Sequence, residues 1–310
     1  MTIALTNTLP RIRAELVVLD ERFARIAGDE YVECLYDGGR WLEGPAYSPA
    51  WRCLIFSDIP NDRMLRWDEV SGHVSVFREP SGYVNGNTID RTGRLISCSQ
   101  GDRQVVRTEY DGSRTVLASH LGSSRLNSPN DVVEHSDGSI WFTDPPYGIT
   151  SNYEGHAAEQ ELDGCHVYRI APDGVLTVVA DDFTRPNGLA FTLDEQQLYV
   201  VDTPEKHIRR FDVDGEKLIG GEVFAPCEAG MFDGIRVDSA GRVWAATHEG
   251  VHCFDPDGTL IGKLLLPNVV SNLTFGGPKG NRLFITATTS VWSWLSTAQG
   301  PQLGFTDRLS

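Results

Sequence analysis

The sequence lacks the long apolar segments that would place it in a membrane or send it across one. None of its apolar runs approaches the length of a transmembrane helix. The N-terminal stretch MTIALTNTLPRIRAEL has no seven-residue apolar core after a basic start, which a signal peptide requires. We therefore predict neither a membrane span nor a signal peptide, and we expect the protein to be cytoplasmic.

Closely spaced cysteines are also absent. The sequence contains no C-x-x-C pair, and its six cysteines are scattered at positions 34, 53, 98, 165, 227 and 253. Most of them fall inside apolar stretches of strand length. This pattern predicts free, mostly buried thiols in a reducing compartment and argues against a disulfide framework or a cysteine-based metal site.

Several catalytic and nucleotide-binding motifs are missing as well. The sequence has no G-x-S-x-G, no H-x-H or H-E-x-x-H, no G-x-G-x-x-G and no P-loop. Its formal net charge of −16 argues against partners such as nucleic acids and anionic membrane surfaces. The functions that remain are those in which the protein acts on a small molecule through side-chain oxygen atoms.

A unit with the length of a β-hairpin recurs six times along the chain. Its copies begin at Glu43, Asn85, Asn130, Asn187, Asp233 and Asn272, with steps of 42, 45, 57, 46 and 39 residues. A period near 45 residues, built from short strands, is typical of a β-propeller blade. We therefore predict an all-β, six-bladed β-propeller as a single domain over residues 31–310.

The segments outside the repeat have simpler interpretations. Residues 1–30 are expected to form an N-terminal arm, loosely ordered over residues 1–13, with a short helix near residues 19–26. The apolar segment 31–35 is expected to pair with the last blade and close the ring, because closure removes exposed sheet edges. The longest step contains PPYGITSNYEGHAAEQELDG, which predicts a loop.

The first residues of the six copies are predicted to meet at the propeller axis. The first strand of a blade is innermost, so these residues should form a ring of two carboxylates and four amides. Hard oxygen ligands of this kind suit Ca²⁺ and do not suit a structural zinc ion. A single Asn-Gly or Asp-Gly is better explained as a turn. Because a side chain with an oxygen atom opens each of the six copies, a common ring of ligands is favoured over six unrelated turns.

The ends of the second strands should return to the same face of the propeller. They are Asp58, Ser99, Asp144, Asp202, His248 and Thr288. Among them Asp144 is the candidate for substrate contact, and His248 is the only imidazole. The alternative is that aspartates at strand ends cap turns.

Five short motifs extend this interpretation to a known family. They are residues 42–45 (LEGP), 128–131 (SPND), 185–188 (RPNG), 232–234 (FDG) and 271–277 (SNLTFGG). Over residues 40–295 the chain resembles the SMP-30/gluconolactonase/luciferin-regenerating family of calcium-dependent propellers, and most closely the bacterial gluconolactonases. The resemblance implies a metal site formed by Glu43, Asn130, Asn187 and Asp233, and hydrolysis of sugar lactones.

A calcium-dependent sugar lactonase is therefore the expected function, with Mg²⁺, Mn²⁺ or Zn²⁺ as other possible ions. Asp233 is expected to act as metal ligand and general base, with Asp144 as the rival base. The predicted substrate contacts are Asn85, Asn130, Asp144, His248 and Asn272. Two alternatives stay open: another metal-dependent hydrolase, acting on other lactones or organophosphates, and a non-catalytic ligand-binding propeller. We expect a monomer or homodimer.

Overall fold

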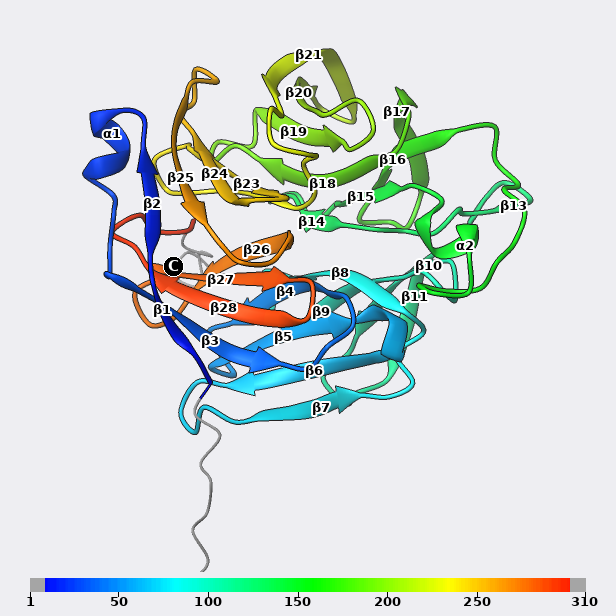
Figure 1. Cartoon of the computed structure of the whole chain (residues 1–310). Coiled ribbons are helices and arrows are strands. Elements are labelled where there is room, and N and C mark those ends of the chain that lie inside the picture. The colour runs from blue at the N-terminus through cyan, green and yellow to red at the C-terminus, as the bar shows by residue number, and fades with distance from the viewer. Residues whose placement is uncertain (1–8, 302–310) are drawn as a thin grey trace, which may run out of the picture.

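The computed structural model describes residues 9–301 of the chain. Within this range, six antiparallel sheets of four or five strands surround a common centre like the blades of a propeller (Figure 1). The predicted all-β, six-bladed architecture is thereby confirmed. In the same range, no helix is both long and apolar enough to cross a membrane.

Blades 1 to 4 contain four strands each, and the first strand of each blade lies nearest the axis (Figure 1). Blade 1 consists of β4 (Leu42–Ser48), β5 (Cys53–Asp58), β6 (Arg63–Asp68) and β7 (Val74–Arg78). Blade 2 consists of β8 (Val84–Ile89), β9 (Leu95–Ser99), β10 (Gln104–Thr108) and β11 (Arg114–Ala118). Blade 3 consists of β14 (Val132–Glu134), β15 (Ile140–Asp144), β16 (Cys165–Ile170) and β17 (Leu176–Phe183). Blade 4 consists of β18 (Pro186–Phe191), β19 (Gln197–Asp202), β20 (His207–Asp214) and β21 (Lys217–Pro226).

Blades 5 and 6 each recruit a strand from the N-terminal region. Blade 5 consists of β22 (Ile235–Val237), β23 (Val243–Thr247), β24 (Gly250–Phe254), β25 (Leu260–Leu265) and β2 (Glu15–Val18). Blade 6 consists of β26 (Val270–Gly276), β27 (Arg282–Ala287), β28 (Ser290–Leu295), β3 (Tyr31–Asp37) and β1 (Arg11–Arg13). The remaining short elements are α1 (Glu21–Ala24), η1 (Ile59–Asn61), β12 (His120–Leu121), β13 (Ser124–Arg125) and α2 (Tyr147–Thr150).

The N-terminal region closes the ring. Strand β3 pairs antiparallel with β28, with Val32 opposite Trp294, as the sequence predicted. Strands β1 and β2 then cover the outer edges of blades 6 and 5. The expectation of a loosely ordered arm is wrong for residues 11–13, which form β1, because β3 offers them a free edge. Leu9 and Pro10 belong to no helix or strand, and residues 1–8, which the prediction also covers, lie outside the described residues.

Apolar side chains fill the spaces between the blades. Trp141, Trp244 and Trp294 are among the largest side chains that are completely buried. Trp244 contacts the rings of Trp294 and Phe275, so aromatic groups join the many aliphatic side chains between blades 5 and 6. All six cysteines are buried and unbridged, as predicted.

The inner strands of neighbouring blades touch through glycine. Gly86 N–H donates to the carbonyl of Asn130 at 2.7 Å, and Gly188 N–H donates to that of Asp233 at 3.2 Å. A Cβ atom at Gly188 would lie 2.4 Å from the Asp233 carbonyl oxygen, closer than Cβ contacts occur. The glycine that follows the first residue of a copy therefore lets adjacent backbones meet, which narrows the central channel.

Candidate active site

The six residues that open the copies are placed at the start of the inner strands, where the blades converge. Glu43 and the four asparagines are buried, whereas Asp233 keeps partial exposure. The Asn272 side-chain amide donates to Glu43 Oε2 at 3.1 Å, across the junction of blades 6 and 1. Asn187 donates a hydrogen bond to the Asp233 carboxylate. These contacts join residues that are far apart in the sequence.

The two ring carboxylates disfavour each other's charge. Burial raises the pKa of Glu43 well above its usual range, and the charge of Asp233 raises it further. Burial also raises the pKa of Asp233, and the charges of Glu154 and Asp131 add to the effect. The hydrogen bond from Asn187 opposes this shift but does not cancel it. Among the described residues, no lysine, arginine or histidine forms a salt bridge with either carboxylate, and none is among the main causes of the two pKa shifts.

This donor set fits a hard divalent cation. Within residues 9–301, no three His, Cys, Asp or Glu side chains gather closely enough to hold a metal ion by themselves, so an ion here would also need the amide oxygens. The ring combines two carboxylates with amide oxygens, which are ligands that Ca²⁺ and similar ions prefer. A bound cation would also remove the repulsion between Glu43 and Asp233, because each charge would then face an opposite charge.

Asp131 is a third carboxylate of the channel and is buried, and the sequence analysis did not identify it. It occupies the position where four other copies have glycine, namely Gly44, Gly86, Gly188 and Gly234. Its Oδ2 lies 3.2 Å from Nη1 of Arg236 on β22, across the channel from β14. This ion pair forms a floor beneath the ring carboxylates. The sequence signal for Asp131 is that this copy has an aspartate at the position where the other copies named here have glycine.

The insertion between β15 and β16, which the sequence predicted to be a loop and which contains the short helix α2, reaches the ring. Tyr147 of α2 hydrogen-bonds with Thr203 and Asn187, and burial raises its pKa to about 12. The charge of Glu154 acts on Asp233. The Arg185 guanidinium lies 5.6 Å from the centre of the Tyr147 ring. Tyr147 and Glu154 are therefore pocket residues that the sequence analysis did not single out.

The aspartates that end the second strands of blades 1, 3 and 4 hydrogen-bond with backbone N–H groups of nearby loops. Asp58, Asp144 and Asp202 each accept a hydrogen bond from the loop that enters their own blade, with Arg40, Asn127 and Thr184 as the N–H donors. Each donor lies three residues before the ring residue of that blade. The turn-capping alternative therefore describes all three aspartates.

The other second-strand positions have varied surroundings. Asp144 is fully buried, so its side chain does not reach the channel surface in this structure. His248 is exposed, and its ring lies against Gly230 in the loop before β22. Ser99 is buried and donates to the Gly82 carbonyl oxygen at 2.8 Å. The second-strand ends therefore do not form a second ring of equivalent side chains.

The fold and the site together define a six-bladed propeller with an oxygen-lined central channel. Residues 41–289 match the family model described as the SMP-30/gluconolactonase/LRE-like region. The chain belongs to this family, and the family resemblance seen in the sequence motifs is confirmed.

Two relatives and one solved structure illustrate the similarity. The chain is 32% identical over 288 residues to a gluconolactonase from Zymomonas mobilis, which covers 84% of this chain and 80% of that protein. It is 31% identical over 252 residues to a pentonolactonase from Haloferax volcanii, covering 79% and 80% of the two chains. A gluconolactonase structure from Xanthomonas campestris superimposes with a TM-score of 0.87 at 39% identity, covering 94% of this chain and 99% of that one.

The hydrogen bonds at Asp144 generate a prediction about stability and pH. Burial raises the pKa of Asp144 from 3.8 to about 7, against hydrogen bonds from the Asn127 and Ser128 backbone. The folded state therefore binds more protons than the unfolded state between these values. The stability from this group is present below pH 4 and is lost as the pH rises through 7.

We expect the free energy of unfolding of the wild-type protein, after removal of metal ions by a chelator, to fall with rising pH between about pH 4 and 7. This fall should be steeper than that of Asp144→Asn. The extra slope should be at most about 1.4 kcal/mol per pH unit. Urea unfolding at several pH values measures it, with the exposed Asp173→Asn as the control for loss of a carboxyl group. If the free energy of unfolding depends on pH in the same way for wild type and Asp144→Asn, the pKa of Asp144 is the same in the folded and unfolded states, and the prediction is wrong.

Proposed function

We propose that this protein hydrolyses a sugar lactone at the mouth of the central channel, with Ca²⁺ held by Glu43, Asn130, Asn187 and Asp233. The observation that carries the proposal is the two ring carboxylates, buried Glu43 and partly exposed Asp233, whose pKa values are raised while no described lysine, arginine or histidine forms a salt bridge with either. The relatives named gluconolactonase and pentonolactonase support a sugar lactone as the substrate class.

Asp233 is the proposed general base. The bound cation would supply a Lewis acid for the lactone carbonyl. Asp233 keeps partial exposure to the channel, so its carboxylate can take a proton from a water molecule that attacks this carbonyl. The bond between the carbonyl carbon and the ring oxygen then breaks. The proton passes to the leaving oxygen, and the product is the open hydroxy acid.

The remaining polar groups of the mouth would orient the sugar hydroxyls. Asn85 and Asn272 are buried ring residues next to the metal ligands, and Tyr147 and Glu154 approach Asp233 from the insertion. We assign Asp144 a positioning role, because it holds the backbone of Asn127 and so the approach to Asn130. The exposed His248 stays a proposed substrate contact at the periphery.

The first prediction concerns metal and substrate together. Exhaustive chelation should abolish hydrolysis of aldonolactones, and a hard divalent ion should restore it, because the two carboxylates repel each other without a cation. A pH-indicator assay with a panel of aldonolactones, an alkyl lactone and an aryl organophosphate measures both effects. Loss of the cation should also lower the melting temperature, since a ligand that binds only the folded state stabilises it.

Each outcome of the panel has a distinct meaning. Preference for aldonolactones supports the proposal, whereas faster turnover of the alkyl lactone or the organophosphate assigns the site to another hydrolase. Inactivity toward the whole panel, despite stoichiometric binding of the cation, would favour a non-catalytic ligand-binding propeller. Full activity after complete metal removal would refute the cation requirement.

The second prediction separates the two roles of Asp233. Asp233→Asn keeps an oxygen that can coordinate a cation but cannot accept a proton. At saturating Ca²⁺ we expect kcat to fall by about 10²–10⁴-fold, the usual contribution of a general base. Asp144→Asn is the matched control, because its amide oxygen can still accept the Asn127 N–H. It should remain near wild type, and the reverse pattern would transfer the base to Asp144.

A further inference from the structure

A second cavity lies at the opposite end of the central channel. Its volume is about 560 Å³, and the inner strands of all six blades line it. Its wall residues follow the ring residues along each inner strand, as Glu134 follows Asn130 on the way into blade 3. The Asp131–Arg236 ion pair stands between this cavity and the ring carboxylates. The cavity is therefore separate from the proposed active site.

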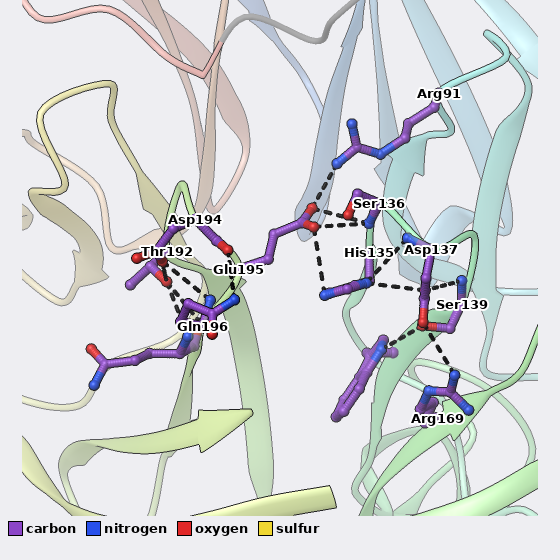
Figure 2. Close-up of polar contacts among 12 residues, drawn as sticks. Arg91, His135, Ser136, Asp137, Ser139, Arg169, Thr192, Asp194, Glu195 and Gln196 are labelled. Carbon is purple, nitrogen blue, oxygen red and sulfur yellow. Dashed lines mark hydrogen bonds and ion pairs between the residues drawn. The ribbon is translucent and has the colours of Figure 1, made fainter. Parts of the chain in front are cut away.

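Most of the charge on the cavity wall is already paired. Arg91 Nη2 lies 2.6 Å from Glu195 Oε1, and Arg236 pairs with Asp131. Glu195 also accepts hydrogen bonds from the Ser136 N–H at 3.1 Å and lies 3.5 Å from the His135 ring (Figure 2). These contacts occupy both oxygens of Glu195. Each guanidinium group therefore faces a carboxylate, although the buried Nε of Arg91 has no hydrogen-bond partner among the described residues.

Glu134 is the charged wall residue without a paired cation. Its Oε2 accepts the backbone N–H of Arg91 at 2.6 Å. Among residues 9–301, no lysine, arginine or histidine nitrogen forms a salt bridge with its carboxylate, and the side chain is partly buried. Burial and the charge of Asp90 raise the pKa of Glu134, whereas the backbone N–H of Arg91 and the charges of Arg91 and Arg94 oppose the shift. A cation in the cavity, close to the carboxylate, would favour its ionised form.

The rest of the wall suits an organic cation better than a metal ion. Phe191 and Phe275 line the cavity and keep part of their ring surface exposed, next to the aliphatic side chains of Ile89 and Val237. Aromatic faces attract ammonium groups. A hard divalent ion takes six to eight oxygens, and one unpaired carboxylate does not provide them.

We propose that this far cavity binds a small organic ammonium ion with an apolar body. Its ammonium group would pair with Glu134, and its apolar part would contact Phe191 and Phe275. The cavity volume is in the range of small-molecule sites, and the net charge of −16 favours cations as ligands of this protein. The inference is independent of the proposed lactone hydrolysis.

The test uses the full-length protein and 2-phenylethylammonium as the probe. Isothermal titration and ligand-observed NMR should detect saturable binding with a dissociation constant of about 1 mM or tighter, while the uncharged 2-phenylethanol should bind at least about tenfold more weakly. Glu134→Gln keeps the acceptor for the Arg91 N–H but removes the charge. It should weaken binding of the ammonium probe by about tenfold or more, and leave the alcohol unaffected.

Controls make the outcome decisive. Asp181→Asn removes an exposed carboxylate from β17 and should bind the probe as wild type does. Phe191→Leu keeps an apolar wall but removes the aromatic face, so it should weaken the ammonium probe more than the alcohol. Melting temperatures of all variants check folding. Absence of saturable binding to wild type, or equal affinity for wild type and Glu134→Gln, would overturn the proposal.

Discussion

The mutual repulsion of Glu43 and Asp233 is the constraint on which the central channel depends. Both carboxylates are held at the start of inner strands, in surroundings that raise their pKa values. The blades cannot move apart to relieve this repulsion, because backbone hydrogen bonds through Gly86 and Gly188 fix the inner strands against each other. In the proposed function, the propeller would hold the cation ligands in place before an ion binds, and the same residues would affect both stability and catalysis.

The two ends of the channel differ in chemistry although the same strands build them. Near the strand starts, carboxylates and amides gather, and the insertion with Tyr147 and Glu154 covers them. Beyond the Asp131–Arg236 pair, the wall becomes aromatic and aliphatic, with most of its charges matched. The ring carboxylates lie at one end of the inner strands, and the aromatic and aliphatic wall of the far cavity lies at the other.

The architecture could be predicted from the sequence because its signals are local and repeated. Turn residues and short apolar runs recur in phase, so the blades, the ring positions and the pairing of β3 with β28 followed from spacing alone. The edge strand β1 was missed, because its pairing depends on a neighbour that only the closed ring provides.

Side-chain direction was the part of the site that the sequence could not supply. Asp144 was expected to contact substrate, yet it faces the Asn127 backbone, because a strand-end aspartate serves equally well as a cap or as a ligand. The floor residues Asp131 and Arg236 belong to different blades, so their pairing appears only in three dimensions. Tyr147 and Glu154 lie in an insertion without periodicity, where no pattern indicates which side chains turn inward.

The most direct test of the ring as a cation site is a crystal structure of the protein grown with Mn²⁺. The anomalous signal of this ion locates it without reference to the expected ligands. The account predicts one peak in the channel, with carboxylate oxygens of Glu43 and Asp233 and the amide oxygen of Asn187 at roughly 2.0–2.6 Å, the range of hard-cation coordination. A channel without a peak, or an ion bound elsewhere while Glu43 and Asp233 stay uncoordinated, would contradict it.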